Sequence, residues 1–176
     1  DAKYESCKKM FGDLGVKFIL NDFFIHWIDK RDGLEGFLRD KGLDLQPEDL
    51  RELRTGIFRG FLHLAKPMNG ARDLLRELGE GRYKIGAVSR NYQEEVRTLL
   101  EYHGLREYFN IVIAREDTRR TKPHPDPYLE CASRFHQKPE QCIGFEDSED
   151  GVLSVKSAGM HCIAVPNDFT RYQDFS

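Results

Sequence analysis

The chain has 176 residues, of which 39% are hydrophobic and 32% are charged, a composition that is typical of a folded globular protein and excludes a disordered one. Its formal net charge of -3 gives no basic surface for nucleic acid or for an anionic bilayer. No apolar run approaches the roughly 18 residues that a membrane-spanning helix needs. We therefore expect neither nucleic acid nor a membrane among its partners.

Four cysteines occur without the CxxC spacing of common metal and redox sites. They are Cys7, Cys131, Cys142 and Cys162. Three of them stand in apolar surroundings that are typical of core positions. The pattern favours reduced thiols in a cytoplasmic protein over a zinc site or a disulfide framework.

The chain up to Lys66 has the pattern of helices. Apolar residues recur at helical spacing at Tyr4, Cys7, Met10, Phe11 and Leu14, and again at Leu50, Leu53, Ile57, Phe61 and Leu64. Gly33 and Gly42 separate the pieces between, and Pro47 suits the first turn of the last helix. We expect a helical domain over residues 1–66.

From Pro67 onward the pattern alternates between helix and strand. Helices are expected from Asn69 to about Leu78, over 93–102, after Pro125 and over 148–158, and short apolar strands over 83–89, 109–114, 142–145 and 161–166. Such an alternation predicts a parallel sheet that is covered by helices on both faces. Residues 67–176 are therefore expected to form an α/β domain with a doubly wound, Rossmann-like sheet.

The first predicted strand is followed by Ser89, Arg90 and Asn91. Right-handed crossovers make the strands of such a sheet point the same way, so their carboxyl ends form one rim where ligands bind. A hydroxyl at this rim can donate to a phosphate oxygen, together with backbone N–H groups of the next helix. Alternatively, Ser89 or Asn91 caps that helix.

The second predicted strand leads into a charged loop that contains Lys122. The X-Pro steps that follow stiffen the chain and would hold the ammonium group in place, although a lone lysine is usually a solvated surface charge. Three arginines, Arg115, Arg119 and Arg120, can steer anions toward it. Glu116 and Asp117 offset them, so a plain solvated loop is the alternative, and His124 fits a turn residue better than a base.

The third predicted strand ends at two adjacent carboxylates, Glu146 and Asp147. Neighbouring like charges repel, so the pair points to a cation. Few hard oxygen ligands at a phosphate-binding rim suit Mg²⁺, which typically takes one or two carboxylates. The alternative is an acidic pair at a helix N-terminus, worth about 0.3–1 kcal/mol, but Glu149 and Asp150 could serve that purpose from the first turn.

Three motifs at these strand ends resemble the haloacid dehalogenase superfamily, in its subfamily with a helical cap, near the β-phosphoglucomutase and phosphoglycolate phosphatase types. AVSRN is similar to the second motif of that family, TKPHPDPYL to the third, and IGFEDSEDGVLSVKSAGM to the fourth with its following helix. The resemblance covers nearly the whole chain. It implies a helical cap over residues 1–66 and a Rossmann-like core over 67–176.

The resemblance also implies a chemistry, which is phosphoryl transfer from a small phosphorylated metabolite through an aspartyl-phosphate. Ser89 would hold the phosphate, with Arg90 and Asn91 beside it, and Lys122 would neutralise it. Asp147 and Glu146 would hold Mg²⁺. Such catalysis consists largely of positioning and charge stabilisation.

One departure from the family is the absence of its first motif, an apolar strand that ends in DxD and carries the nucleophilic aspartate. Asp1 does not match, because no strand precedes it. The chain as written is therefore expected to be inactive, with the nucleophile lying upstream of it. The missing strand is expected in the middle of the sheet.

Three other functions stay open at this point. A phosphomutase is one, since Arg31 lies in the cap segment DKRDG, which resembles a substrate-contacting loop of sugar-phosphate mutases but equally fits a polar helix connection. A haloacid dehalogenase proper fits less well, because it would leave the acidic pair without a cation. A non-catalytic binding module is the last, if the first motif is truly lost.

Overall fold

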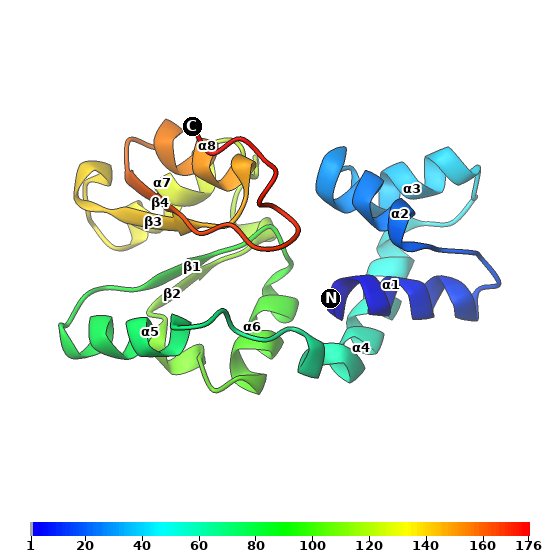
Figure 1. Cartoon of the computed structure of the whole chain (residues 1–176), viewed down its shortest axis with the longest axis horizontal. Coiled ribbons are helices and arrows are strands. Elements are labelled where there is room, and N and C mark those ends of the chain that lie inside the picture. Colours follow the sequence, from blue (N-terminus) through cyan, green and yellow to red (C-terminus); the bar gives the residue numbers. More distant parts are fainter. Residues whose placement is uncertain (1) are drawn as a thin grey trace. The chain divides into compact units, whose positions relative to one another are not determined.

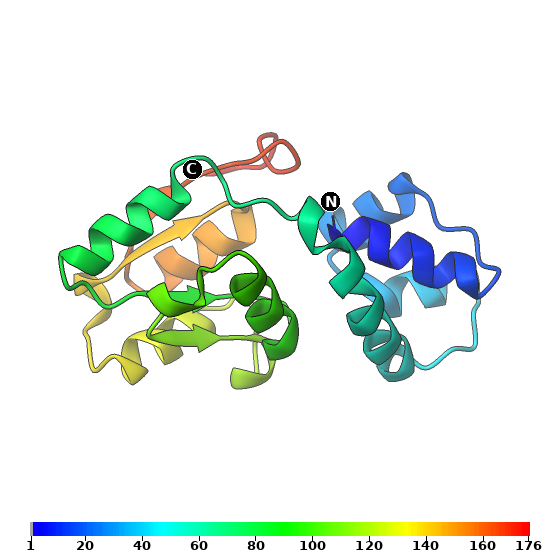
Figure 2. The ribbon, with the colours of Figure 1, turned by 90° about the horizontal axis from the view of Figure 1, so that it is seen from below.

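The computed structural model describes residues 2–176, and the chain divides between Pro67 and Met68 into two compact units. Figures 1 and 2 show that the first unit is built from helices and that the strands belong to the second. Within residues 2–176, no helix has the length and apolar character needed to cross a membrane.

The first unit consists of four α-helices, one π-helical turn (η1) and one 3₁₀ helix (η2) within residues 2–67. They are α1 (Ala2–Asp13), α2 (Leu20–Phe23), η1 (Phe24–Asp29), α3 (Gly33–Lys41), α4 (Pro47–Phe58) and η2 (Arg59–Leu64). Gly42 ends α3 in the left-handed conformation, at φ 63°, where glycine carries no Cβ penalty. Pro47 opens α4 with Glu48 and Asp49 in the first turn, as the sequence predicts.

The core of the first unit is apolar and rich in aromatic rings. Its buried members are Cys7, Met10, Phe11, Phe18, Phe23, Leu34, Phe37, Leu38 and Leu50. Trp27, the single tryptophan of the chain, stacks on Phe23 with ring centroids 5.6 Å apart and meets Phe18 edge-on at 5.7 Å. Its fluorescence therefore reports on the packing of this core.

The apolar stripe predicted over residues 50–64 is wrong in part. Leu50 is buried, but Leu53 and Leu64 are 44% and 40% exposed. The buried face instead follows every fourth residue, through Leu50, Arg54, Phe58 and Leu62. Apolar residue types alone do not identify this face, because it includes Arg54. The aliphatic stem of an arginine can cover apolar surface as well.

The second unit alternates strand and helix, which confirms the predicted order of elements. The helices are α5 (Ala71–Glu80), α6 (Gln93–Tyr102), α7 (Asp126–Arg134) and α8 (Glu149–Ser157), and the strands are β1 (Gly86–Val88), β2 (Ile111–Ile113), β3 (Ile143–Glu146) and β4 (His161–Ala164). Short 3₁₀ helices lie between them at η3 (Arg106–Tyr108), η4 (Arg115–Asp117) and η5 (Pro139–Gln141). The strands β1, β2 and β4 are shorter than predicted, while β3 has the predicted length but lies one residue later. Gly70 at φ 80° stands at the start of α5 in place of the predicted cap Asn69.

The strands of residues 2–176 form two parallel pairs rather than the one sheet that the sequence predicts. β1 pairs with β2, and β3 pairs with β4 in the register Ile143 to His161. Helix α7 packs against β1 and β2, α8 packs against β3 and β4, and α7 contacts α8. The two helices thus join the two pairs of strands (Figure 1).

One face of the β3–β4 pair is not covered within this part of the chain. Ile143, Phe145 and Ile163 are 59%, 47% and 45% exposed, while Gly144 and Glu146 on the alternate positions are buried. Alternation along a strand places these two sets on opposite faces. Cover on both faces, as expected from the sequence, is therefore not seen for this pair of strands.

Two leucines of α4 test the corrected stripe. Leu50→Ala is expected to lower the free energy of unfolding of the first unit by about 2–4 kcal/mol, because it opens a cavity in the core. Leu53→Ala, one turn away on the same helix, is expected to cost less than about 1 kcal/mol, because the side chain is half exposed. Urea denaturation followed by Trp27 fluorescence measures both, and equal losses would contradict the assignment of the buried face.

Candidate active site

The side chain of Lys122 lies between the carboxyl ends of β1 and β3. Its Nζ donates a hydrogen bond to the carbonyl of Val88 at 3.0 Å and forms an ion pair with Glu146. The two side chains are only 9% and 5% exposed. One ammonium group therefore connects the ends of two strands that belong to different strand pairs.

The loop that carries Lys122 is fastened to the helix after β3. Ser154 of α8 donates from its hydroxyl to the carbonyl of His124 at 2.5 Å, and the His124 N–H donates to Thr121 across a turn. His124 is thus a turn residue, as the sequence favours. The loop is held by long-range hydrogen bonds as well as by its prolines.

The two acidic residues of this loop, Glu116 and Asp117, have partners within the second unit. The Glu116 carboxylate accepts the N–H of Gln93 at the start of α6, at 3.1 Å from each oxygen. Asp117 accepts the Ala114 N–H and pairs with Arg134. Burial would raise the pKa of Asp117, but these two contacts hold it below its ordinary value. Glu116 and Asp117 therefore have structural roles in addition to offsetting the charge of the arginines.

Ser89 extends the pairing of β1 and presents its hydroxyl at the strand end. Its N–H donates to the carbonyl of Ile113 at 2.9 Å, and its Oγ accepts the N–H of Asn91 at 3.1 Å. Helix α6 begins at Gln93, with Tyr92 at the cap position and no side-chain cap. Neither Ser89 nor Asn91 caps that helix, so this alternative is wrong, and the Ser89 hydroxyl keeps a proton that it can donate.

Arg90 connects the segment after β1 to the helix after β3. Its Nη1 donates to Oδ2 of Asp150 at 2.9 Å, and the Asp150 side chain is 6% exposed. Asp150 thus binds Arg90 in addition to its favourable interaction with the positive end of the α8 helix dipole. Ser148, whose Oγ accepts the Gly151 N–H at 3.3 Å, provides the cap of that helix.

The acidic pair after β3 is divided between the interior and the surface. Glu146 is buried, and a Cβ added at Gly151 would overlap its carboxylate. Asp147 is exposed, and its Oδ2 accepts a hydrogen bond from Asn167 at 2.8 Å. The repulsion expected between two neighbouring carboxylates is thus reduced by separate partners.

Tyr128 is a member of the site that the sequence analysis missed. Its hydroxyl donates to Oε1 of Glu146, and its ring centroid lies 5.1 Å from the Lys122 Nζ. Burial, together with the neighbouring Glu146 charge, holds the pKa of the hydroxyl far above its ordinary value. The tyrosine in TKPHPDPYL was visible in the sequence, and a buried tyrosine hydroxyl usually needs a partner.

The donor set fits a magnesium ion only in part. Within residues 2–176, no group of three or more His, Cys, Asp or Glu side chains could hold a metal. Glu146 and Asp147 are adjacent carboxylates at one strand end, and Mg²⁺ needs only one or two of these when water or substrate oxygens complete its shell. Asp147 is exposed, whereas Oε1 of Glu146 is engaged by Lys122 and Tyr128, so the described residues supply at most part of the ligand shell of Mg²⁺.

Arg31 belongs to the first unit, whereas the residues described above belong to the second. It has φ 58°, and its Nε donates to the carbonyl of Ile28 at 3.2 Å. Its neighbours Lys30 and Asp32 are held by α3, through an ion pair of Lys30 with Asp40 at 2.8 Å and one of Asp32 with Arg39 at 2.8 Å.

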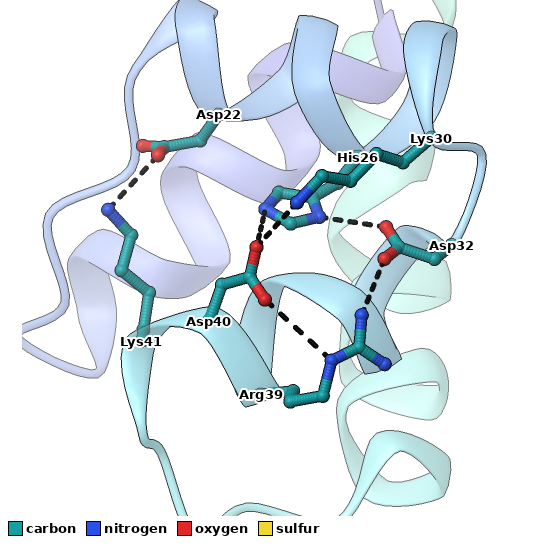
Figure 3. Close-up of polar contacts among 7 residues, drawn as sticks. All are labelled: Asp22, His26, Lys30, Asp32, Arg39, Asp40 and Lys41. Carbon is teal, nitrogen blue, oxygen red and sulfur yellow. Dashed lines mark hydrogen bonds and ion pairs between the residues drawn. The ribbon is translucent and has the colours of Figure 1, made fainter.

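A buried histidine stands at the centre of this network (Figure 3). The Nδ1 of His26 lies 2.8 Å from Asp32 and its Nε2 lies 3.7 Å from Asp40, and the residue is 3% exposed. Burial would raise the pKa of Asp32, but the His26 contact and Arg39 hold it below its ordinary value. A Cβ added at Gly36 would overlap Asp32, so the DKRDG segment packs closely on α3.

The strand ends of the second unit define an α/β protein whose polar groups gather at the carboxyl ends of parallel strands, where ligands of such proteins bind. Residues 24–165 match the haloacid dehalogenase-like hydrolase family. The match covers most of the 176 residues, and the chain belongs to this family.

Solved structures of this family have the same fold. CbbY from Rhodobacter sphaeroides superposes with a TM-score of 0.86 at 22% identity and covers 99% of this chain and 83% of its own. β-Phosphoglucomutase from Clostridium difficile gives 0.78 at 20% identity, over 94% of this chain and 78% of its own. The predicted fold family is therefore confirmed.

Curated relatives are more similar in sequence. The Bacillus subtilis protein YhcW is 33% identical over 129 residues, which cover 73% of this chain and 59% of that protein. The fructose-1-phosphate phosphatase YqaB of Escherichia coli is 31% identical over 122 residues, covering 69% of this chain and 64% of that one. The chain thus spans less than two thirds of the length of either relative.

Two glycines test the close contact behind Glu146. Gly151→Ala is expected to destabilise the second unit by about 1–3 kcal/mol, because the new methyl group meets the buried carboxylate. Gly79→Ala in α5, where a Cβ meets nothing within 4 Å, is expected to be neutral or to stabilise by up to about 1 kcal/mol. Far-UV circular dichroism in urea measures both, and an unchanged Gly151→Ala variant would contradict the packing of Glu146.

The Asp32 contacts predict a pH dependence in the first unit. Because the folded-state pKa of Asp32 is lowered, its contribution is present above the ordinary pKa and is lost as the pH falls through the folded value. Asp32→Asn is expected to cost about 1–2 kcal/mol at pH 6 and nothing at a pH well below the lowered pKa. Urea denaturation followed by Trp27 fluorescence at both pH values tests this, and a pH-independent cost would refute it.

Proposed function

We propose that the full-length protein is a Mg²⁺-dependent phosphatase that acts on a small phosphorylated metabolite. The observation that supports this most strongly is the position of Lys122, whose ammonium group contacts Val88 at the end of β1 and Glu146 at the end of β3. A nearly buried positive charge at the meeting point of two strand ends is suited to a phosphoryl group. A lysine that served only as a solvated surface charge would not need to be buried at this position.

Each polar group at the rim has a role in this proposal. Ser89 donates its hydroxyl hydrogen to a phosphate oxygen, with Arg90 and Asn91 as neighbours that shape the same end of β1. Lys122 neutralises the phosphate charge. Asp147, with Glu146 beside it, would hold Mg²⁺, which when bound would supply positive charge to the phosphoryl oxygens.

The nucleophile, in this proposal, is a carboxylate on a strand outside these 176 residues. One observation supports this position for it. The strands β1 and β3 belong to separate pairs, although Lys122 contacts the carboxyl ends of both. A further parallel strand between β1 and β3 would complete one sheet and end beside Lys122, and without it the chain would be inactive.

The substrate is proposed to be a sugar phosphate or a similar small ester. YqaB of E. coli is named for fructose 1-phosphate, and a relative in Thermotoga maritima, 32% identical over 105 residues, is named a phosphorylated carbohydrates phosphatase. Arg31 in the helical unit is proposed to contact the substrate. The loop that carries Arg31 is fixed by the ion pairs of Lys30 and Asp32, so the backbone of Arg31 has a defined position.

Two alternatives remain to be separated from this proposal. A phosphomutase is favoured by the fold shared with β-phosphoglucomutase, and product analysis distinguishes it, since a mutase returns an isomer where a phosphatase releases inorganic phosphate. A non-catalytic binding module is disfavoured by the cost of burying the Lys122–Glu146 pair, which a scaffold would not need. Intact mass and N-terminal sequencing of the native protein distinguish it, because the enzyme needs an upstream segment with an aspartate nucleophile.

The decisive experiment assays the full-length protein on p-nitrophenyl phosphate and a panel of sugar phosphates, with and without Mg²⁺. Turnover is expected only with the metal, and Lys122→Met is expected to lower kcat/KM by at least about 100-fold, as the loss of a charge-stabilising group does. Lys138→Met, at an exposed position, is the matched control and should keep full activity. Absence of metal-dependent turnover on every substrate would refute the phosphatase.

A further inference from the structure

The hydroxyl of Tyr128 contacts the group that holds Lys122. It donates to Oε1 of Glu146, the same oxygen with which the Lys122 ammonium is paired. Tyr128 is 7% exposed, and its ring faces the Lys122 Nζ at 5.1 Å. One tyrosine therefore touches both members of the ion pair.

The packing of the Tyr128 ring does not explain why this residue is a tyrosine rather than a phenylalanine. The ring lies in a small core with Val155 and Ala158, against which Val88 and Cys162 also pack. A phenylalanine would fill that core equally well. Burying a phenol costs free energy unless it is hydrogen-bonded, so the hydroxyl is explained by its bond to Glu146.

That bond fixes the Glu146 carboxylate from one side, while the backbone of α8 confines it from the other. Oε1 receives the Tyr128 hydroxyl and the Lys122 ammonium, and Oε2 lies where a Cβ of residue 151 would be. A carboxylate with both oxygens confined cannot rotate freely. The ammonium group paired with it is therefore confined as well, between this carboxylate and the carbonyl of Val88.

We propose that Tyr128 is a positioning residue for Lys122, and that its hydroxyl fixes Glu146 so that the ammonium group stays at the strand ends. The expected effect on phosphate binding rests on the proposed function, in which Lys122 contacts a phosphoryl group at the strand ends. Loss of the hydroxyl leaves the core filled but lets Glu146 turn, and Lys122 moves with it.

Phosphate binding to the full-length protein tests this consequence. Inorganic phosphate is titrated calorimetrically, in the presence of Mg²⁺, into the wild type, Tyr128→Phe, Lys122→Met and the double variant. Tyr128→Phe is expected to weaken binding about five- to tenfold, the size of one ordinary hydrogen bond, because the lost bond acts on the phosphate only through Glu146 and Lys122. In the Lys122→Met background it is expected to change nothing, because the hydroxyl acts through Lys122. Tyr102→Phe, at an exposed tyrosine of α6, is the matched control.

A second measurement needs no ligand. The acetylation rate of Lys122 by acetic anhydride, relative to that of Lys138, reports how firmly the ammonium group is held. Tyr128→Phe is expected to raise this ratio several-fold, and Tyr102→Phe to leave it unchanged. An unchanged ratio in Tyr128→Phe overturns the inference, as does an equal loss of phosphate affinity in both backgrounds. A raised ratio in a protein that binds no phosphate supports the positioning of Lys122 and refutes the phosphatase instead.

Discussion

The rest of the candidate site depends on one buried ion pair, between Lys122 and Glu146. Removing two charges from water is costly, and a buried pair is tolerated only when further hydrogen bonds satisfy both partners. Here the Val88 carbonyl completes the ammonium side and the Tyr128 hydroxyl completes the carboxylate side. Because these partners come from β1, β3, α7 and the loop before it, the pair fixes the relative positions of all four elements.

Local patterns in the sequence were enough to predict the elements and the order of the polar groups. Gly104 follows α6 in the left-handed conformation, at φ 59°, and Ser148 caps α8, because short-range backbone preferences decide such helix ends. The placement of a hydroxyl, a lysine and an acidic pair after successive strands followed from the alternation of helix and strand alone. In the structure these groups stand at or after the ends of β1, β2 and β3 in that order.

The partners of these groups could not be predicted, because they are far apart in the chain. Arg90 and Asp150 are separated by 60 residues, and Lys122 and Glu146 by 24. No local pattern states which carboxylate a given cation will meet. The two separate strand pairs were also unexpected, since sequence periodicity predicts strands but not their neighbours in the sheet.

The acidic pair shows how two adjacent residues at a strand end come to lie in different surroundings. Side chains of consecutive strand residues point to opposite faces, and Glu146 is the last residue of β3. Its carboxylate is therefore directed to the face that α7 and α8 cover, where it holds Lys122, while Asp147 leaves the strand and stays exposed. The two adjacent acids at the strand end thus have separate partners, Lys122 for Glu146 and Asn167 for Asp147, which is why the crowding of like charges is tolerated at this position.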